Sequence, residues 1–366
     1  MTSTAVTHVN LLHFRSHRKL ELELDERPVA LYGPNGIGKT NILEALSLLS
    51  PGRGLRRASA EDMARKPDVL GWKIRARIST PDSTHDVETF SEKGAARRVL
   101  IDGKAAPQTK LAAMLRMVWL IPSMDRLWIE GAEGRRRFLD RTTLSFFPDH
   151  ADATLSYEKA MRDRNRLLRD GVSDAHWYRA LEVTMSAAAE RIQQNRRHAL
   201  RRITSALSDT ETAFPVARLA LISPGELPDV EGADALTQVW EDTRTRDLAA
   251  GRTLIGPHRS DLEAHYVKKN SPARDCSTGE QKALLISLIL ANARALRSGD
   301  GAAPIVLLDE VAAHLDATRQ AHLYDEICAL EIQCWMTGTG PEMFAPLLDR
   351  AQLFALEDDT GTLARQ

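Results

Sequence analysis

The sequence predicts an α/β fold into which a mainly helical segment is inserted. An apolar strand, a glycine-rich turn and a helix follow one another within residues 28–50, and a second apolar strand at residues 304–308 ends in two carboxylates. Between these parts, apolar residues recur at helical spacing from residue 152 to about residue 207. Strands that are apolar along their whole length are typical of parallel sheets that helices bury on both faces.

Length and composition indicate an ordinary folded protein. The 366 residues are 43% hydrophobic, which is enough to bury a sizeable core. No run approaches the roughly 18 consecutive apolar residues of a membrane span, and residues 1–10 lack the basic and apolar parts of a secretory signal. The three cysteines, an odd number without metal-ligand spacing, argue against a disulfide framework or a zinc site. We therefore expect a cytoplasmic protein that works without a membrane.

The charge is nearly balanced overall and uneven along the chain. The formal net charge of −1 provides no general attraction to nucleic acid. Residues 126–202 hold sixteen Arg or Lys against eleven Asp or Glu, a local excess of +5. This excess indicates a nucleic-acid surface or, as the count alone favours, a solvated helix surface with internal ion pairs.

The elements before residue 122 are predicted to be mostly strands. Alternating apolar stretches in residues 6–24 predict a hairpin, and residues 28–32 predict a short buried strand. The glycine-rich turn follows at once, and residues 40–50 have the apolar spacing of a helix that Pro51 terminates. Residues 70–105 alternate again between turn residues, which predicts a small antiparallel sheet.

Long helices follow, and strands then return. Residues 152–170 predict one helix, and residues 173–207 predict a second that would extend some 50 Å at about 1.5 Å per residue. Its apolar stripe is Trp177, Leu181, Thr184, Ala188, Ile192, Asn195, Ala199, Ile203 and Ala206. Such a helix serves as a projecting arm that contacts DNA or as one member of a globular bundle, and the sequence leaves both open. Near residue 251 strands return, followed by a helix at 277–297, the strand at 304–308 and a final αβ unit.

The glycine-rich turn has the pattern G-x-x-x-x-G-K-[ST] of a phosphate-binding P-loop. Its predicted nucleotide contacts are Gly33, Pro34, Asn35, Gly36, Ile37, Gly38, Lys39, Thr40 and Asn41. The glycines let backbone N–H groups approach phosphate oxygens, Lys39 neutralises the β and γ phosphates, and the Thr40 hydroxyl ligates Mg²⁺. Because the pattern lies between a predicted strand and a predicted helix, it indicates an ATP site rather than a chance glycine turn.

The strand at residues 304–308 delivers Asp309 and Glu310 at its carboxyl end, where α/β sheets place their ligands. Asp309 would hold Mg²⁺ through its water shell. Glu310 would orient or deprotonate the water that attacks the γ phosphate, so Glu310 and Lys39 are the predicted catalytic residues. An acidic pair after an apolar strand is common by chance. Asp309 and Glu310 are evidence for an ATP site because the P-loop lies upstream in the same chain.

The segment Cys276 to Lys282, CSTGEQK, resembles the signature motif of ABC-type ATPases, although that family usually has Leu in place of Cys276. In those proteins the signature binds ATP held by a second subunit, which assigns Ser277, Gly279 and Glu280 to the nucleotide. The alternative is an ordinary Ser277 N-cap with Glu280 in a capping box. The position of the segment, one helix before Asp309, favours the signature.

Two further motifs of ABC-type ATPases are less regular here. Residues 313–316, Ala-His-Leu-Asp, resemble the D-loop that crosses a dimer interface and add Asp316 to the predicted nucleotide contacts. After the last predicted strand, where many of these proteins have a switch histidine, the chain reads WMTGTG. Thr337 or Thr339 would have to replace that histidine through a hydroxyl.

Several motifs together resemble the RecF family in particular. They are FRSHR at residues 14–18, GPNGIGKTNILEAL at 33–46, EGRRRFLDR at 133–141, IGPHRSDLE at 255–263 and TGTG at 337–340. The P-loop and the signature also lie more than 230 residues apart, far more than in a compact transporter ATPase. The resemblance implies an ABC/SMC-type P-loop ATPase head, split into residues 1–121 and 250–366, with an inserted, mainly helical second lobe at residues 122–249.

The resemblance to the RecF family also implies a function. Its members bind ATP with Mg²⁺, dimerise on it, hydrolyse it slowly with stimulation by DNA, and bind duplex or gapped DNA. They act with RecR and RecO to help RecA load at single-strand gaps during recombinational repair and replication restart, and they support the SOS response. The rival interpretations are an SMC-like structural clamp and a transport-type ABC subunit; the latter would need a Gln loop and a switch histidine, and neither is evident.

Six arginines are candidates for contacts to the DNA backbone. They are Arg53, Arg56 and Arg57 after the P-loop helix and Arg135, Arg136 and Arg137 at the start of the insertion. The equally favoured alternative is structural pairing with nearby acids such as Glu133 and Asp140. His258 and Arg259 are expected to be structural or interface residues rather than catalytic ones.

Overall fold

The computed structural model describes residues 3–66, 70–208, 212–223, 230, 232–299, 303–312, 315–347, 349–357 and 363–365. Contacts divide the chain into two compact units. The first, here the head unit, comprises Met1–Asp125, Ala206–Val216 and Ser277–Gln366, and the second, here the insert unit, comprises Arg126–Ser205 and Ala217–Cys276. In the described parts of the chain, no helix combines the length and the apolar character needed to cross a membrane.

A mostly parallel sheet forms the centre of the head unit. Its strand order is β15-β14-β3-β13-β12-β8. All neighbours are parallel except β15, which pairs antiparallel with β14. The strands are β3 (Val29–Tyr32), β8 (Met117–Leu120), β12 (Ile305–Leu308), β13 (Cys334–Gly338), β14 (Gln352–Leu356) and β15 (Leu363–Arg365). Residues of β3, β8 and β12 are buried throughout, as apolar strands covered on both faces must be.

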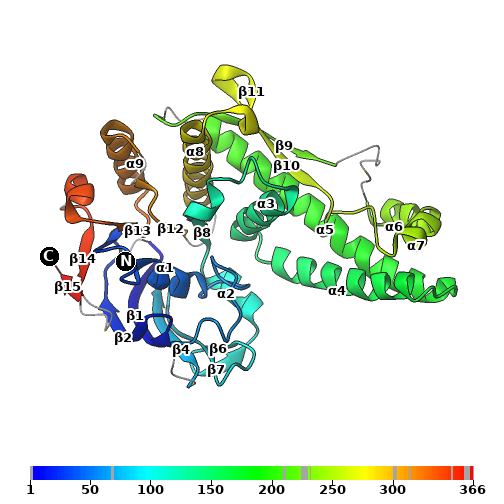
Figure 1. Ribbon diagram of the computed structural model, residues 1–366, viewed down its shortest axis with the longest axis horizontal. Helices are drawn as coiled ribbons and strands as arrows, with labels where there is room; N and C mark the ends of the chain where they lie inside the picture. Colours follow the sequence, from blue (N-terminus) through cyan, green and yellow to red (C-terminus); the bar gives the residue numbers. More distant parts are fainter. Residues whose placement is uncertain are drawn as a thin grey trace. The chain divides into compact units, whose positions relative to one another are not determined.

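Helices and a second sheet cover the parallel sheet. Figure 1 shows α8 (Thr278–Arg297) and α9 (Ala317–Ala329) on one side of it, and α1 (Lys39–Ser47) with the second sheet on the other. The second sheet is antiparallel, with the order β2-β1-β4-β5-β6-β7. Its strands are β1 (Ala5–Phe14), β2 (His17–Glu23), β4 (Trp72–Ser79), β5 (Thr84–Ser91), β6 (Arg98–Ile101) and β7 (Lys104–Ala106). The short helices of this unit are α2 (Leu111–Met114) and the 3-10 turns Gln108–Lys110, Pro122–Met124 and Pro341–Leu347.

One hydrophobic core joins both sheets through α1. Val9, Leu43, Ile74 and Trp335 are fully buried in this core, and they come from β1, α1, β4 and β13. The amphipathic spacing of α1 therefore holds the helix that follows the P-loop between two sheets. Because the start of α1 is fixed in this way, the glycine-rich loop before it has a defined position.

The insert unit is mainly helical and also contains a small antiparallel sheet. Its helices are α3 (Ala132–Phe146), α4 (His150–Arg169), α5 (Ala175–Ser208), α6 (Ala233–Asp242) and α7 (Arg244–Ala250). The sheet has the order β11-β10-β9, with β9 (Ala217–Ile222), β10 (Asp261–Tyr266) and β11 (Ser271–Pro272), and the 3-10 turns Val267–Lys269 and Ala273–Asp275 complete the unit. Tyr157, Met185, Ile192 and Trp240 form the centre of its core.

A buried ion network ties α4, α5 and α7 together. Arg164 is fully buried and donates to Glu182 Oε1 at 3.0 Å and to Asp247 Oδ2 at 2.6 Å. It also donates to the Thr253 hydroxyl at 2.9 Å. A buried guanidinium is tolerated because carboxylates and hydrogen bonds satisfy it, and removing Arg164 would deprive two buried carboxylates of their shared cation.

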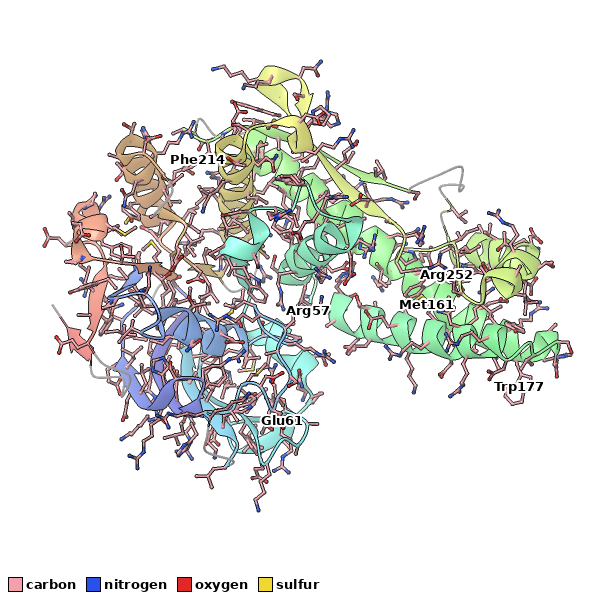
Figure 2. The ribbon with its side chains drawn as sticks, in the orientation of Figure 1. Arg57, Glu61, Met161, Trp177, Phe214 and Arg252 are labelled. Atoms are coloured by element: carbon pink, nitrogen blue, oxygen red, sulfur yellow. The ribbon has the colours of Figure 1, made fainter. Side chains whose placement is uncertain are left out.

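The predicted elements correspond closely to the observed ones, with two exceptions. The hairpin, the P-loop strand and helix, the small antiparallel sheet, the two long helices and the C-terminal elements are confirmed. The short strands β8 and β9 were not predicted, because four to six apolar residues fit a strand or a loop equally well, and the largely polar α3 was not predicted either. Trp177, predicted for the buried stripe of α5, is 64% exposed and projects from the ribbon (Figure 2).

The two units divide at other positions than the predicted domains. The contact boundaries follow residues 125 and 276 instead of 121 and 249, and residues 206–216 group with the head unit. The physical reason is the sheet of the insert unit, in which β10 pairs with β9 from Asp261↔Ile222 to Tyr266↔Ala217. This pairing attaches residues 250–276 to the insert unit, although they follow the helical segment in sequence.

Candidate nucleotide-binding and hydrolysis site

The P-loop lies between β3 and α1, as predicted, and its glycines are required by its shape. Gly33, Gly36 and Gly38 have φ values of 147°, 84° and 106°. A Cβ on Gly38 would lie 2.6 Å from the Ser16 hydroxyl, and one on Gly33 would lie 2.6 Å from the Leu356 carbonyl oxygen. Pro34, Asn35 and Gly36 form the exposed crest of the loop, Ile37 is half-buried, and α1 begins directly after Gly38. The loop is thus a concave turn of backbone ending at a helix N-terminus, a fit for phosphate oxygens.

Lys39 is buried and lies against the loop. Its ammonium donates to the carbonyl oxygens of Gly33 at 2.7 Å and Pro34 at 2.9 Å. Burial lowers the pKa of this ammonium below its ordinary value, and the carboxylates of Glu310 and Asp309 oppose the shift. Phosphate oxygens that enter the loop would give the cation stronger partners than two carbonyls do.

Asp309 lies at the carboxyl end of β12 and is held by two threonine hydroxyls. Thr40 Oγ1 donates to its carboxylate at 2.8 and 3.1 Å, and Thr337 Oγ1 donates at 2.9 Å. Burial raises the pKa of Asp309, and the hydrogen bonds from Thr40 and Thr337 act in the opposite direction. The tertiary structure thus brings together the two predicted magnesium-binding residues, Thr40 and Asp309.

The donor set suits Mg²⁺ bound together with a nucleotide. Mg²⁺ typically keeps several waters and takes one or two protein oxygens together with substrate phosphates. Within the described residues there is no group of three or more His, Cys, Asp or Glu side chains that could hold a metal by themselves. Thr40 and Asp309 therefore fit an ion that is completed by phosphate oxygens and water, where it would neutralise charge on the phosphates.

Glu310 follows Asp309 in an unusual backbone conformation. Its φ is 53°, in the left-handed region that a non-glycine residue adopts at a cost. Its N–H donates to Thr337 Oγ1 at 2.8 Å. The Thr337 hydroxyl is therefore shared between the backbone of Glu310 and the carboxylate of Asp309, and it holds both acidic residues of the site.

Thr337 had been predicted only as one of two substitutes for a switch histidine. Its hydroxyl contacts Asp309, while Thr339 is exposed and donates to Met343 Sδ at 3.4 Å. The parallel register of β12 and β13, in which Leu308 lies opposite Met336, places Thr337 beside Asp309. The sequence contains no signal for this register, so the positioning role of Thr337 could not be predicted.

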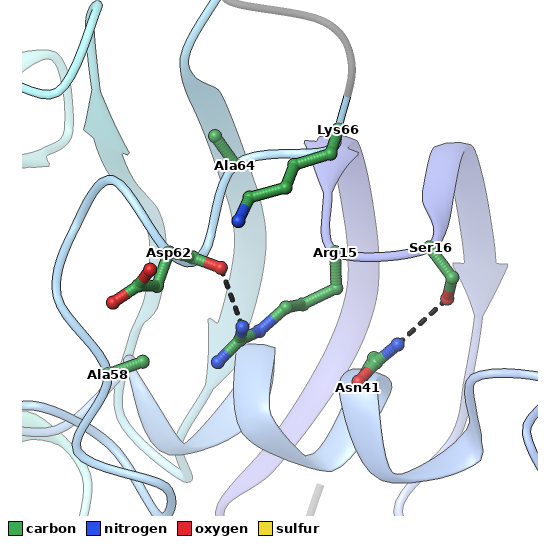
Figure 3. A pocket seen from close by; sticks show the side chains of 7 residues that line it. All are labelled: Arg15, Ser16, Asn41, Ala58, Asp62, Ala64 and Lys66. Carbon is green, nitrogen blue, oxygen red and sulfur yellow. Dashed lines mark hydrogen bonds between the residues drawn. The ribbon is translucent and has the colours of Figure 1, made fainter.

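A pocket of about 540 Å³ lies beside the first turn of α1 (Figure 3). It is lined by Arg15, Ser16, Asn41, Ala58, Asp62, Ala64 and Lys66. Asn41 donates to the Ser16 hydroxyl at 2.8 Å and accepts from Arg56 at 2.7 Å. The Arg15 guanidinium forms a fork on the buried Glu44, with distances of 2.7 and 2.9 Å. The FRSHR motif, which served as a family marker, thus lines a polar pocket next to the phosphate loop.

The signature segment has the capping geometry of a helix N-terminus. Ser277 Oγ accepts from the Glu280 N–H at 3.4 Å, and Glu280 Oε2 accepts from the Ser277 N–H at 3.1 Å. The capping box, which the sequence allowed as the alternative to an ATP-binding signature, is therefore present. Ser277 and Gly279 are exposed, and no atom lies within 4 Å of the position of a Cβ on Gly279. An open helix N-terminus of this kind is accessible to an anion carried by another molecule.

Asp316, the predicted D-loop contact, caps α9. Its carboxylate accepts from the Arg319 N–H at 2.9 Å, and its side chain is exposed. Residues 313 and 314 of the predicted D-loop lie outside the described residues. Any contact of Asp316 with a nucleotide would come in addition to its capping role.

The six candidate DNA-contacting arginines differ in their surroundings. Arg53 and Arg57 are exposed and have no hydrogen-bond or ion-pair partner among the described residues, and Arg57 projects from the loop after α1 (Figure 2). Arg56 is 41% exposed and contacts Glu44 at 3.2 Å.

The three arginines at the start of the insertion, Arg135, Arg136 and Arg137, are bonded to other groups of the insert unit. Arg135 forms a fork on Asp261 with two distances of 2.8 Å, and this hydrogen bonding raises the pKa of its guanidinium. Arg136 donates to the Ser260 carbonyl oxygen at 3.2 Å, and Arg137 pairs with Glu133. For Arg135 the geometry supports the structural alternative, with Asp261 rather than Glu133 or Asp140 as the partner.

His258 of the GPHRSDL motif is a structural residue, as expected. Its Nδ1 lies 2.7 Å from the Tyr157 hydroxyl and its Nε2 lies 3.1 Å from the Thr253 carbonyl oxygen. This places the ring proton on Nε2 and makes Nδ1 an acceptor. Burial lowers the pKa of His258 to about 4, so the ring is neutral near pH 7. A Cβ on Gly256 would collide with the Tyr157 hydroxyl, which explains the glycine in this motif.

Three comparisons place this geometry among known proteins. The RecF/RecN/SMC N terminal domain family matches residues 5–359. The DNA replication and repair proteins RecF of Mesorhizobium japonicum and Allorhizobium ampelinum are 41% and 44% identical to the chain and cover 98% and 97% of it, with 97% and 98% of their own lengths matched. The solved structure of the recombination mediator protein RecF-ATP in the RecFOR pathway has a TM-score of 0.85 at 22% identity and covers 100% of both chains.

Proposed function

The chain belongs to the RecF family of ABC/SMC-type ATPases, and on this premise we propose that it is an ATP-dependent DNA-binding protein of recombinational repair. The observation that carries the ATPase part of the proposal is the cluster of Thr40, Asp309 and Thr337 beside the P-loop. This cluster joins the carboxyl ends of β12 and β13 to the first turn of α1, the edge at which α/β sheets bind ligands.

The triphosphate of ATP would bind in the P-loop. Backbone N–H groups of residues 33–41 would contact the phosphates, Lys39 would move from its carbonyl partners to the β and γ phosphates, and Thr40 with Asp309 would hold the Mg²⁺. Glu310 would orient or deprotonate the attacking water. Its strained backbone and its hydrogen bond to Thr337 restrict the directions in which its carboxylate can point.

The pocket next to α1 would hold the nucleoside side of ATP. It shares Asn41 with the first turn of α1 and Ser16 with the wall of the P-loop, so the ligand can continue into it from the phosphate site. Arg15 and Lys66 would supply positive charge there. This assignment explains why the FRSHR motif lies beside a phosphate loop.

Hydrolysis is proposed to need two copies of the chain. The exposed N-terminus of α8, with Ser277, Gly279 and Glu280, would bind the γ phosphate of ATP held in the P-loop of a second copy, and Asp316 would lie at the same interface. ATP would then link two chains, so that binding stabilises the dimer and hydrolysis weakens it. We expect slow turnover that DNA accelerates.

The DNA part of the proposal rests on the RecF relatives and on exposed cations. Arg53, Arg56 and Arg57 are exposed on the head unit and suit contacts to a phosphate backbone. The proposed substrates are duplex or gapped DNA. The proposed partners are RecR and RecO, with which the chain would help RecA load at single-strand gaps and support the SOS response.

Multi-angle light scattering with and without ATP and Mg²⁺ tests the composite site. The unaltered chain should dimerise with ATP. Lys39→Ala should lose both ATP binding and dimerisation, whereas Ser277→Arg should still bind ATP and remain monomeric. Glu310→Gln should bind ATP, hydrolyse it slowly and accumulate as the dimer. A Ser277→Arg variant that dimerises as well as the unaltered chain would show that α8 takes no part in the site.

Fluorescence anisotropy over gapped, duplex and single-stranded DNA, with and without ATP, tests the DNA part. Binding should be strongest with ATP and should weaken steeply as salt rises from 50 to 200 mM, because it rests on backbone contacts. A chain that binds none of the three DNAs under any nucleotide condition contradicts the proposed role in repair.

A further inference from the structure

A pocket of about 300 Å³ lies within the insert unit, and none of its lining residues belongs to the nucleotide site. It is lined by Gln193, Arg197, Leu200, Arg201, Leu221, Ser223 and Ser260. The first four residues lie on one face of α5, and Leu221 and Ser223 belong to β9 and its end. The β9–β10 ladder ends at Asp261↔Ile222, so Ser223 and Ser260 lie at its open end.

The pocket contains the kinds of donor that bind an anion. Arg197 and Arg201 lie one helical turn apart, about 6 Å along α5. Gln193 and Ser260 are 8% and 5% exposed, so polar side chains more than nine-tenths buried line the pocket together with the two arginines. Among the described residues that line it, none is acidic.

The surrounding charge is positive as well. Between Arg191 and Ser208, α5 contains five arginines and no acidic residue. Arg136 donates to the Ser260 carbonyl oxygen at 3.2 Å. Burial lowers the pKa of Arg136, and the neighbouring cations Arg196 and Arg259 lower it further, while Asp261 opposes them. Cations therefore accumulate around the end of the β9–β10 ladder.

Two carboxylates close in sequence to pocket or neighbouring residues are paired with other arginines. Asp261, which follows Ser260, accepts the fork from Arg135 at 2.8 Å. Asp140 accepts a fork from Arg196 at 2.7 and 2.9 Å. These pairs involve Arg135 and Arg196, and neither of the two carboxylates belongs to the lining of the pocket, which contains Arg197 and Arg201.

We propose that this pocket binds a backbone phosphate of DNA and that Arg197 and Arg201 are its principal contacts. Arginines together with serine and glutamine side chains are the usual donors to phosphodiester oxygens. Two of the seven lining residues, Leu200 and Leu221, are apolar, so a peptide partner would find little surface for apolar anchors. The acidic side chain of a protein partner is therefore the less favoured occupant.

The assignment rests on the proposed DNA-binding function and extends it. Arg135 is bonded to Asp261. Arg197 and Arg201 on α5 therefore take its place as the proposed DNA contacts of the insert unit. The positive excess of residues 126–202 then has a specific location, because residues 191–202 of α5 contribute five of its sixteen basic residues.

The test is the salt dependence of duplex-DNA affinity for the double variant Arg197→Gln/Arg201→Gln. Each lost phosphate contact lowers the slope of log K against log salt by about 0.9, so the double variant should lose about 1.8 of slope and roughly 30-fold in affinity at 0.15 M salt. The matched control is Arg162→Gln/Arg166→Gln on α4, whose two arginines are each 67% exposed and also lie one turn apart. It removes the same charge and should change the slope by less than 0.5.

The outcomes separate this assignment from the proposed function. Both double variants should bind ATP normally and keep the circular dichroism spectrum of the unaltered chain, which establishes that they are folded. If the unaltered chain binds DNA and the α5 double variant has the same slope, the pocket is not a phosphate site, although the proposed function stands. Competition by polyglutamate that the α5 variant abolishes, with DNA binding unchanged, would assign the pocket to an acidic peptide and overturn the proposal. If the unaltered chain binds no DNA, both the assignment of the pocket and the proposed DNA-binding function are wrong.

Discussion

Replacing Thr337 by valine removes one hydroxyl that two acidic residues share. The Oγ1 atom donates to Asp309 at 2.9 Å and accepts from the Glu310 N–H at 2.8 Å. Thr337 and Asp309 are 1% and 4% exposed, so water cannot readily replace either bond. Valine has nearly the same shape as threonine, and the change therefore tests the hydroxyl and not the packing.

The expected effect is larger on catalysis than on ATP binding. Losing a buried hydrogen bond to a charged group costs about 1.5–3 kcal/mol of folding stability. A Glu310 carboxylate displaced by about 1 Å should lower kcat roughly 100-fold. ATP affinity should change less than threefold, because the phosphates are held by the P-loop. The acid limb of the kcat profile should move to higher pH, since the hydrogen bond from Thr337 holds down the pKa of Asp309.

Steady-state ATP hydrolysis, titration with a fluorescent ATP analogue and thermal unfolding measure these three effects. Thr337→Ser keeps the hydroxyl and should retain most of the activity. Thr339→Val is the matched control, because it removes an exposed threonine hydroxyl two residues away. Normal kcat in Thr337→Val, or a loss of activity that saturating ATP restores, would refute the positioning role of Thr337.

Three further predictions concern the loop glycines, Arg135 and His258. Gly38→Ala should abolish ATP binding, because its Cβ would meet the Ser16 hydroxyl at 2.6 Å and the His17 ring at 2.8 Å. The Cβ of Gly36→Ala meets nothing within 4 Å, so this variant should cost only about 1–3 kcal/mol of backbone strain. Nucleotide titration of both variants checks this difference, and equal ATP affinities would contradict it. Arg135→Gln should destabilise the protein by about 1–3 kcal/mol, since it leaves the half-buried Asp261 without its partner. It should change the salt slope of DNA binding by less than 0.5. Denaturant unfolding and anisotropy measure the two quantities, and a variant of unchanged stability with a lower slope would restore Arg135 as a DNA contact. The pKa of His258 is about 4 in the folded protein against about 6.5 in the unfolded chain, so the unfolded chain binds more protons between these values. Its contribution to stability is complete above pH 6.5 and is lost as the pH falls to 4, by on the order of 3 kcal/mol. Urea unfolding at several pH values should show this loss in the unaltered chain and a shallower one in His258→Gln; parallel curves would mean that His258 titrates normally.

The predicted nucleotide site came from short motifs whose chemistry is local. The P-loop is recognisable because the glycines at 33 and 38, Lys39 and Thr40 must have fixed spacing to surround a phosphate. The capping box of α8 is visible for the same reason, since Ser277 and Glu280 lie within one turn. Apolar strands and long amphipathic helices were likewise predictable from periodicity alone.

The residues that the sequence did not reveal are linked by long-range pairing. Thr337 reaches Asp309 because β12 and β13 are parallel neighbours in one register, and Arg135 reaches Asp261 across 126 positions of the chain. The boundary after residue 276 has the same origin, because β9 and β10 pair across the intervening α6 and α7.

By itself the sequence determined the class of ligand, the order of strands and helices around the P-loop, and the two carboxylates at the end of β12. Only the tertiary structure decided how these parts are held: a threonine shared by Asp309 and Glu310, arginines committed to internal acids, and a basic pocket between α5 and β9. The physical reason is that local spacing determines which backbone turn or helix forms, whereas a side chain finds its partner through strand register and packing across distant segments.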